Sequence, residues 1–128
     1  MDNQSYAQAV NAHYTPGDLG AAILDGLRAA GKNPETPTLD DLSPVDHYHI
    51  QGKAGTLELA QLANITPQMR VLDVGGGLGG AARLLASQVG CKVTVVDLTK
   101  TYCQVGEMLT HRTGLSEQVT FQQGSALE

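Results

Sequence analysis

Hydrophobic residues recur at helical spacing in the first half of the chain. Four of them, at i, i+4 and i+3 spacing with one adjacent pair, would share one helix face: Leu19, Ile23, Leu24 and Leu27. Asp18 before this pattern and Gly31 after it have the residue types favoured at an N-cap and at the end of a helix. A second helix is expected over about 53–63, with Leu57 and Ala60 facing inward.

The segment between these helices has a different composition. Residues 32–48 contain three prolines and four acidic residues. This composition predicts an ordered loop or linker rather than a helix or strand. A connection of this length is unusual without secondary structure and is typical of a functional or mobile segment.

From residue 70 onward the pattern alternates between strands and helices. Residues 70–75 form a short apolar run without clear alternation, as in a parallel strand covered on both faces. Runs at 92–98 and 118–124 predict two more strands. Between the strands, 79–90 and 99–112 predict helices. Their expected inner faces are Ala82, Leu85, Ala86 and Val89 in the first, and Tyr102, Val105 and Leu109 in the second.

This order predicts an α/β fold. It is Rossmann-like, a partial doubly wound parallel sheet of three strands (β-α-β-α-β) preceded by N-terminal helices. Gly106 falls inside the last helix, where glycine costs about 1 kcal/mol relative to alanine, which indicates tight packing. We expect residues 1–52 to form a helical and loop cap and residues 53–128 to form the ligand-binding unit.

Composition narrows the possible functions. The net charge of −5 argues against a broad nucleic-acid interface, because phosphate binding needs a clustered positive surface. No apolar run approaches the roughly 20 residues that span a bilayer, and the N-terminus has no signal-peptide pattern. The two cysteines, Cys91 and Cys103, lack CxxC spacing and are expected in the core. Together these features predict a cytoplasmic protein.

The candidate chemistry lies in "VLDVGGGLGG", Val71 to Gly80, which places five glycines within six positions after the first strand. Glycine permits positive φ and lets a ligand lie against the backbone, while the following helix N-terminus favours an anionic group. Gly75, Gly77 and Gly80 satisfy the dinucleotide fingerprint G-x-G-x-x-G. Asp97 ends the second strand, where it would accept hydrogen bonds from ribose hydroxyls.

Asp73 distinguishes between possible ligands. It lies inside the first strand, where a dinucleotide-binding strand is normally apolar, and a buried carboxylate needs hydrogen-bond partners. The available partners are N–H groups of the glycine loop or a cationic amine of the ligand. A ligand with an amino-acid end near Asp73 and an adenosine end near Asp97 matches S-adenosylmethionine (SAM) better than NAD.

The same stretch resembles the first motif of class I SAM-dependent methyltransferases, an acid followed by x-Gly-x-Gly-x-Gly. The matching positions are Asp73, Gly75, Gly77 and Gly79, with Gly76 inside the motif. "VVDLT" is similar to the family's acidic strand end, which implies Asp97 on the ribose and Leu98 beside the adenine. "FQQGSALE" resembles the segment that closes over the adenine edge, usually Gly-Asp-Ala. Here Ser125 replaces the acid, and Ser125 and Ala126 are the expected adenine contacts.

The upstream segment "LSPVDHYHIQGKAGTLELAQLA" also resembles the lead-in of bacterial small-molecule methyltransferases. This resemblance implies that His49 and the residues after it lie near the methionine end of the cofactor, and His49 is the candidate general base. His47 and His49 would face the same side of a strand, as in a metal site, but only Asp46 could add a ligand. We therefore expect no metal.

The resemblance implies a SAM-dependent methyltransferase that transfers a methyl group to an O, N or C atom of a small molecule and leaves S-adenosylhomocysteine (SAH). A general base is one possible aid to such a transfer. Two alternatives remain: an NAD(P)-binding oxidoreductase domain, against which Asp73 argues, and a SAM-binding or oligomerising module without turnover.

The length of the chain adds a further expectation. The resemblance implies a complete fold of seven strands, and the sequence predicts three. We expect the chain to be a fragment that ends at Glu128 and contains the cofactor-binding half. The first strand would then have an unpaired apolar edge, and we expect two copies to form a homodimer through residues 70–74.

Overall fold

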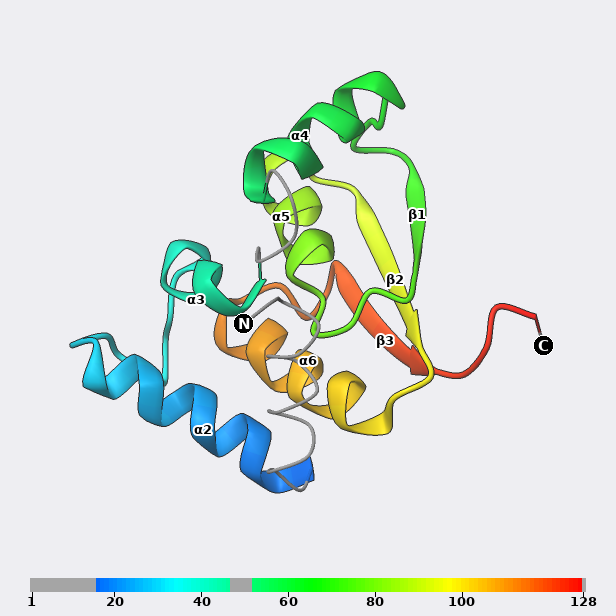
Figure 1. The fold of residues 1–128 in the computed structure, drawn as a ribbon. Coiled ribbons are helices and arrows are strands. Elements are labelled where there is room, and N and C mark those ends of the chain that lie inside the picture. The colour runs from blue at the N-terminus through cyan, green and yellow to red at the C-terminus, as the bar shows by residue number, and fades with distance from the viewer. Residues whose placement is uncertain (1–15, 47–51, 128) are drawn as a thin grey trace.

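The chain folds as a small β-sheet with helices packed on one of its faces (Figure 1). The computed structural model describes residues 16–46 and 52–127. In chain order the elements are α2 (Pro16–Ala29), α3 (Leu39–Asp46), α4 (Gly52–Leu62), β1 (Arg70–Val74), α5 (Gly80–Gln88), β2 (Lys92–Asp97), α6 (Lys100–Arg112) and β3 (Val119–Gln123). The predicted β-α-β-α-β order preceded by helices is confirmed.

All three strands are parallel and lie in the order β1-β2-β3. Asp73 in β1 is in register with Val95 in β2, which is in register with Phe121 in β3. Because parallel strands end on the same side, the glycine loop after β1 and Asp97 at the end of β2 meet at one edge of the sheet. The Gly75 N–H donates to the Val96 carbonyl oxygen at 2.7 Å and holds the start of the loop against β2.

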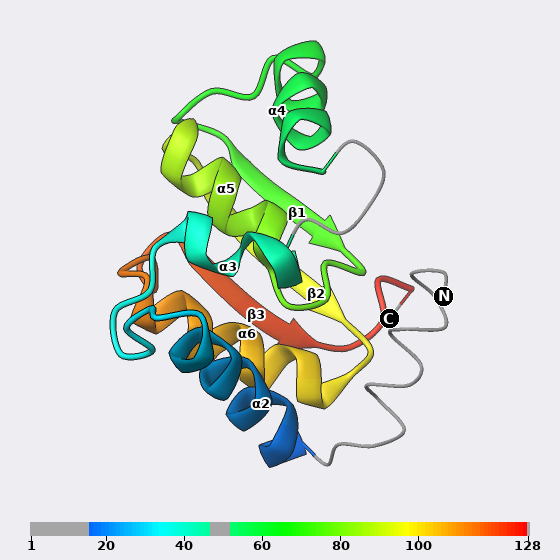
Figure 2. The same cartoon turned by 60° about the vertical axis from the view of Figure 1, so that its left-hand side comes forward.

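Two layers of helices cover one face of the sheet (Figures 1 and 2). Helices α5 and α6 pack directly on the strands, α3 and α4 pack on α5, and α2 packs on α6. One cluster between α5 and the sheet contains Ala82, Leu85, Ala86, Val93 and Val95. A second joins α2 and α3 to α6 through Leu19, Ile23, Leu27, Leu42, Val105 and Leu109. The predicted inner faces of these helices are confirmed, and the N-terminal helices share a core with the sheet-forming part.

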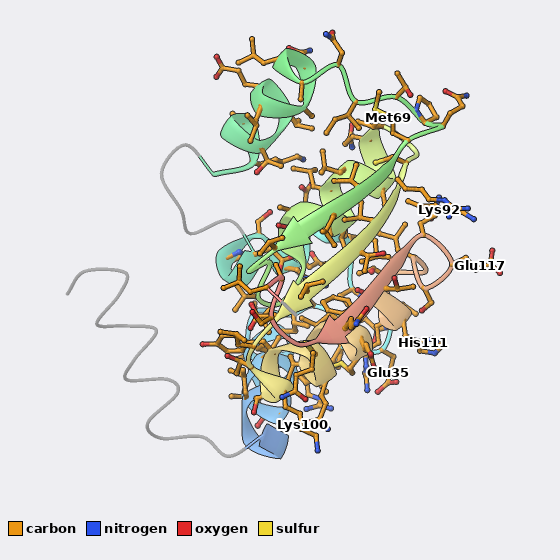
Figure 3. All side chains as sticks on the ribbon, turned by 90° about the vertical axis from the view of Figure 1, so that its right-hand side faces the viewer. Glu35, Met69, Lys92, Lys100, His111 and Glu117 are labelled. Atoms are coloured by element: carbon orange, nitrogen blue, oxygen red, sulfur yellow. The ribbon has the colours of Figure 1, made fainter. Side chains whose placement is uncertain are left out.

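The opposite face of the sheet has no helix of the described ranges packed on it, and Figure 3 looks toward that side of the molecule. Leu72 and Val74 are 60% and 58% exposed there. On the same face of the neighbouring strand, Thr94 lies opposite both Leu72 and Thr120, and the two threonine hydroxyls are 3.4 Å apart. The expectation that this strand is covered on both faces is therefore wrong for the described residues, since the described helices pack on the other face of the sheet.

Helix α3 forms inside the segment 32–48 that was predicted to be a loop, so this prediction is wrong for Leu39–Asp46. The Thr38 hydroxyl accepts a hydrogen bond from the Asp41 N–H at 3.1 Å, and the Asp41 carboxylate accepts one from the Thr38 N–H at 3.0 Å. This reciprocal pair satisfies two backbone donors at the helix start, and it allows a helix to form although Pro44 lies inside it. The hydrogen bonds from Thr38 also lower the pKa of the Asp41 carboxyl.

Of the two boundaries predicted for the first helix, the end is confirmed and the start is wrong. Gly31 and Gly114 follow α2 and α6 with φ of 76° and 77°, as expected for residues that end helices. Thr99 is the N-cap of α6, although its side chain makes no capping hydrogen bond. The assignment of Asp18 as an N-cap is wrong because α2 begins at Pro16, whose fixed φ suits the first turn.

Cys91 and Cys103 are free and buried, as predicted for core residues. Burial raises the pKa of both thiols. Among the helices that the structure describes, none combines the length and apolar character needed to cross a membrane.

Candidate functional site

The glycine loop leaves part of its backbone open. Gly75 and Gly77 have φ of 71° and 59°, values that L side chains rarely adopt. A Cβ built on either residue would have no atom within 4 Å. These two glycines therefore combine a left-handed backbone with free space beside it, which is the arrangement that close approach of a ligand to the backbone requires.

Three other glycines of the motif pack against the protein itself. A Cβ on Gly76 would lie 2.7 Å from the Asp73 carboxylate. A Cβ on Gly79 would overlap the Phe121 ring, and one on Gly80 would overlap the Asp46 side chain. The five glycines of the motif therefore serve two purposes. Two leave open space beside the backbone, and three permit close packing inside the protein.

Asp97 ties the glycine loop to the end of β2. One carboxylate oxygen accepts a hydrogen bond from the Gly77 N–H at 2.9 Å, and the other accepts one from the Thr99 N–H at 2.9 Å. Each oxygen has two lone pairs, so both keep capacity for a further donor. The sequence predicted Asp97 as a ligand-binding acid, but it did not predict that this residue also holds the loop.

Asp73 is half-buried behind the loop and faces the same region as Asp97. Burial raises the pKa of the Asp73 carboxyl, and the negative charge of Asp97 adds to the effect. Among the described residues no group donates a hydrogen bond to the Asp73 carboxylate. Of the two partners expected from the sequence, the loop N–H groups do not bond to it. A cationic group of a ligand is the remaining candidate.

The residues expected near an adenine also lie at this edge of the sheet. Leu98 is 73% exposed directly after Asp97. The Gly124 N–H donates to the Asp97 carbonyl oxygen at 2.9 Å and brings the end of β3 alongside. Ser125 is half-buried, with its hydroxyl accepting the Leu127 N–H at 3.1 Å, and Ala126 is exposed. The candidate residues that follow β1, β2 and β3 therefore lie together at one edge of the sheet.

The histidine candidates cannot be placed in this way. His47 and His49 lie outside the described residues. Within residues 16–46 and 52–127, no group of three or more His, Cys, Asp or Glu side chains is arranged to hold a metal ion.

Sequence reasoning missed Arg83, which lies on α5 directly behind the glycine loop. Its side chain is 0% exposed and pairs with the Asp46 carboxylate at 2.8 Å. The available signal was its place as the one charged residue in "GGAARLLASQVG", next to a stripe of small apolar positions.

Comparison with known proteins decides the family. A family model described as a methyltransferase domain matches residues 71–128, from β1 to the end of the chain. Residues 71–128 belong to this methyltransferase family. The match includes the glycine loop, Asp97 and the segment after β3.

Individual methyltransferases support the same assignment. The chain is 34% identical over 91 residues to a glycine/sarcosine/dimethylglycine N-methyltransferase from Actinopolyspora halophila, covering 71% of this chain and 15% of that protein. A Galdieria sulphuraria protein assigned as a sarcosine dimethylglycine methyltransferase aligns with a TM-score of 0.55 and 30% identity, over 59% of this chain and 28% of the other. A geranyl diphosphate methyltransferase solved with SAM aligns with a TM-score of 0.57 and 25% identity, over 62% and 33%.

The matched methyltransferases are much longer than this chain. The aligned region spans at most 28% of the first three curated relatives. The range matched by the family model contains the parallel sheet with its glycine loop, and SAM is the cofactor of this family.

Proposed function

We propose that this chain is the cofactor-binding part of a SAM-dependent methyltransferase that acts on a small molecule. The observation that carries the proposal is the open backbone at Gly75 and Gly77, which lies between the half-buried Asp73 and Asp97 at one edge of the sheet. The family match supports the reaction type.

The residues at this edge fit the chemistry of SAM from one end to the other. The unpaired Asp73 carboxylate suits the cationic amine of the methionine end, and the open backbone at Gly75 and Gly77 suits a ligand lying against it. Asp97 would accept hydrogen bonds from the ribose hydroxyls while it holds Gly77. Leu98, Ser125 and Ala126 would contact the adenine. Gly76 and Gly79 would shape the loop rather than touch the ligand.

The bound cofactor supplies an electrophilic methyl group on a sulfonium sulfur. The chain's own residues bind and orient that group, so that a nucleophile of the acceptor meets it in line and water is excluded. We propose His49, from the lead-in segment, as the general base where the acceptor must lose a proton. We also propose that residues 1–52 act as a cap over the cofactor-binding unit 53–128.

A small acceptor agrees with the charge of the chain. The net charge of −5 disfavours a polyanionic substrate such as RNA or DNA. The relative from Actinopolyspora halophila is named for glycine, sarcosine and dimethylglycine, which are small amines. We propose an acceptor of small-molecule size and a cytoplasmic location, where Cys91 and Cys103 would stay reduced.

The free edge of β1 supports a proposal about assembly. Among the described strands β1 pairs only with β2, and Leu72 and Val74 are exposed beside the unpaired edge. An open apolar edge favours addition of another strand. We propose that a second copy of this chain pairs there to form a homodimer.

Ligand-induced thermal stabilisation tests the cofactor proposal. SAH should raise the Tm of the chain in a saturable way, since a ligand that binds the native state stabilises it, whereas NADH should leave the Tm unchanged. Stabilisation by NADH and not by SAH would overturn the proposal in favour of an oxidoreductase domain. Methyl transfer from SAM to sarcosine then separates an enzyme from a module that binds SAM without turnover.

A further inference from the structure

Arg83 makes a set of buried contacts behind the glycine loop. Its Nη1 donates to the Leu78 carbonyl oxygen at 2.7 Å, to the Thr110 hydroxyl at 3.1 Å and to the Gly106 carbonyl oxygen at 3.4 Å. Its Nη2 donates to the Asp46 carboxylate at 2.8 Å. The Nε atom is buried without a hydrogen-bond partner among the described residues.

Stability alone does not explain this arrangement. The side chains of Arg83 and Asp46 are 0% and 1% exposed, so both charges have lost their hydration. A buried ion pair of this kind is often no more stable than well-packed apolar residues of similar volume. An apolar side chain at position 83 could fill the space but could not bond to the Leu78 carbonyl oxygen. We therefore expect the ion pair to fix the conformation of the glycine loop rather than to add to the free energy of unfolding.

The contacts of Arg83 join three separate parts of the fold. Leu78 belongs to the glycine loop, Gly106 and Thr110 belong to α6, and Asp46 is the last residue of α3. Close packing fixes the same region, because a Cβ on Gly106 would lie 2.9 Å from the Leu78 carbonyl oxygen. The loop, α3 and α6 thus meet at one guanidinium group.

Asp97 and Arg83 hold two adjacent residues of the loop, Gly77 and Leu78. Asp97 accepts the Gly77 N–H, and Arg83 donates to the carbonyl of the next residue, Leu78. The Gly79 N–H donates to the Gly76 carbonyl oxygen at 3.0 Å and closes the turn between them. A shift of the guanidinium would therefore displace the peptide between Leu78 and Gly79, one residue beyond Gly77.

We infer that Arg83, oriented by Asp46, is a positioning residue that fixes the glycine loop and couples its geometry to helix α3. Arg83 acts through the Leu78 carbonyl and does not touch the ligand. What the loop binds rests on the proposed function, but the positioning of the loop does not. The coupling makes α3, a helix outside residues 71–128, part of what sets the shape of the cofactor loop.

Hydrogen exchange of backbone amides, measured without ligand, tests the positioning. In Arg83→Lys the charge remains, but a single ammonium group cannot reproduce the planar fork that contacts Leu78, Thr110 and Asp46 together. Exchange at Gly77 and Gly79 should rise about tenfold. Exchange at the buried strand positions Val93 and Val95 should stay within about twofold of the parent. An equal rise at all four amides would show a merely structural ion pair and overturn the inference.

Two less disruptive variants test the same inference if Arg83→Lys does not fold. Asp46→Asn removes the charge that orients the guanidinium, and Thr110→Val removes one acceptor with little change in shape. Each single variant should raise the exchange rates of the Gly77 and Gly79 amides by a few fold. In an Arg83→Lys background, Asp46→Asn should raise these rates little further, because the two residues act through one contact. Unchanged loop exchange in both single variants would overturn the inference.

Arg112→Lys is the matched control. Arg112 lies on α6 and also ties an N-terminal segment to it, through the Pro34 carbonyl oxygen at 2.8 Å and Glu35 at 3.3 Å. Neither of these contacts involves the glycine loop. Its replacement should leave exchange at Gly77 and Gly79 unchanged.

SAH affinity separates this inference from the proposed function. Arg83→Lys should weaken SAH binding about tenfold, and Arg112→Lys should not. If the parent chain fails to bind SAH while Arg83→Lys still loosens Gly77 and Gly79, the cofactor proposal fails and the positioning inference stands. If the parent binds SAH and Arg83→Lys binds equally well with unchanged loop exchange, the positioning inference fails alone.

Discussion

Asp73 carries a carboxylate that is half-buried and lacks a hydrogen-bond donor among the described residues. Asp73→Asn should remove an unfavourable charge at neutral pH and raise the free energy of unfolding by roughly 0.5–1 kcal/mol, a small value because water screens the exposed part. The same change should weaken SAH binding by about 1.5–3 kcal/mol, since a charged partner of the amine is lost. Thermal unfolding and calorimetry measure the two effects, and a destabilised variant would contradict the assignment.

The raised pKa of Asp73 also gives a pH dependence with a defined sign. The folded chain holds this proton to higher pH than the unfolded chain, whose ordinary pKa is 3.8. Below that pKa the parent and Asp73→Asn should be equally stable. As pH rises through the raised pKa, the parent should lose stability relative to the variant. The SAH affinity of the parent should fall as the pH is lowered, because protonation removes the negative charge of Asp73. An affinity that stays constant as the pH falls through the raised pKa of Asp73 would exclude Asp73 from the site.

Asp97 should respond differently to mutation because the protein itself uses its charge. Asp97→Ala removes the acceptor of both the Gly77 and the Thr99 N–H groups, so the free energy of unfolding should fall by about 1–2 kcal/mol. SAH affinity should fall by roughly 1.5–3 kcal/mol as well. Thr99→Ala is the control, since the Thr99 side chain makes no capping bond and its loss should matter little. Unchanged SAH affinity in Asp97→Ala would remove Asp97 from the site.

At the scale of single elements, the sequence predicted helices and strands where one residue pattern dominated. The stripe Leu19, Ile23 and Leu27 and the β-branched run of β2 correspond to real elements because burial of one face decides their conformation. Helix α3 was missed because prolines and acids suggested a loop. The Thr38–Asp41 pair that stabilises its start was visible in the sequence, as a threonine followed three residues later by an acid.

Helix α6 offers a test of the packing predicted for Gly106. Gly106→Ala should gain helix propensity worth up to about 1 kcal/mol, but its Cβ would overlap the Phe121 ring. Overpacking of this kind costs about 1–3 kcal/mol, so the net effect should be destabilising. Gly26→Ala in α2 is the matched control, because a Cβ there has no atom within 4 Å, and it should stabilise the chain by about 0.5–1 kcal/mol. Urea unfolding measures both changes, and a stabilised Gly106→Ala would contradict the packing.

At the scale of the whole molecule, the sequence could place the candidate site but not its internal supports. The order of strands and the rule that ligands bind at the carboxyl ends of parallel strands sufficed to bring Asp73, Asp97 and Ser125 to one edge. The meeting of Arg83 and Asp46 behind the loop is a contact between residues 37 positions apart. Which glycines face open space depends on packing against residues of other elements, such as Phe121 and Asp46. The pattern within α5 sets Arg83 apart as the one charged residue, but it does not identify Asp46 as its partner.

The exposed edge of β1 is a property of the whole molecule, and it gives the last prediction. If two copies pair through β1, the chain should sediment as a dimer at micromolar concentrations. Leu72→Lys should convert it to a monomer, because a charged residue on an edge strand opposes strand addition. Ala29→Lys, at an exposed position of α2 on the helical side of the sheet (Figure 1), should remain a dimer. A monomeric parent, or a dimer that persists in Leu72→Lys, would contradict pairing through this edge.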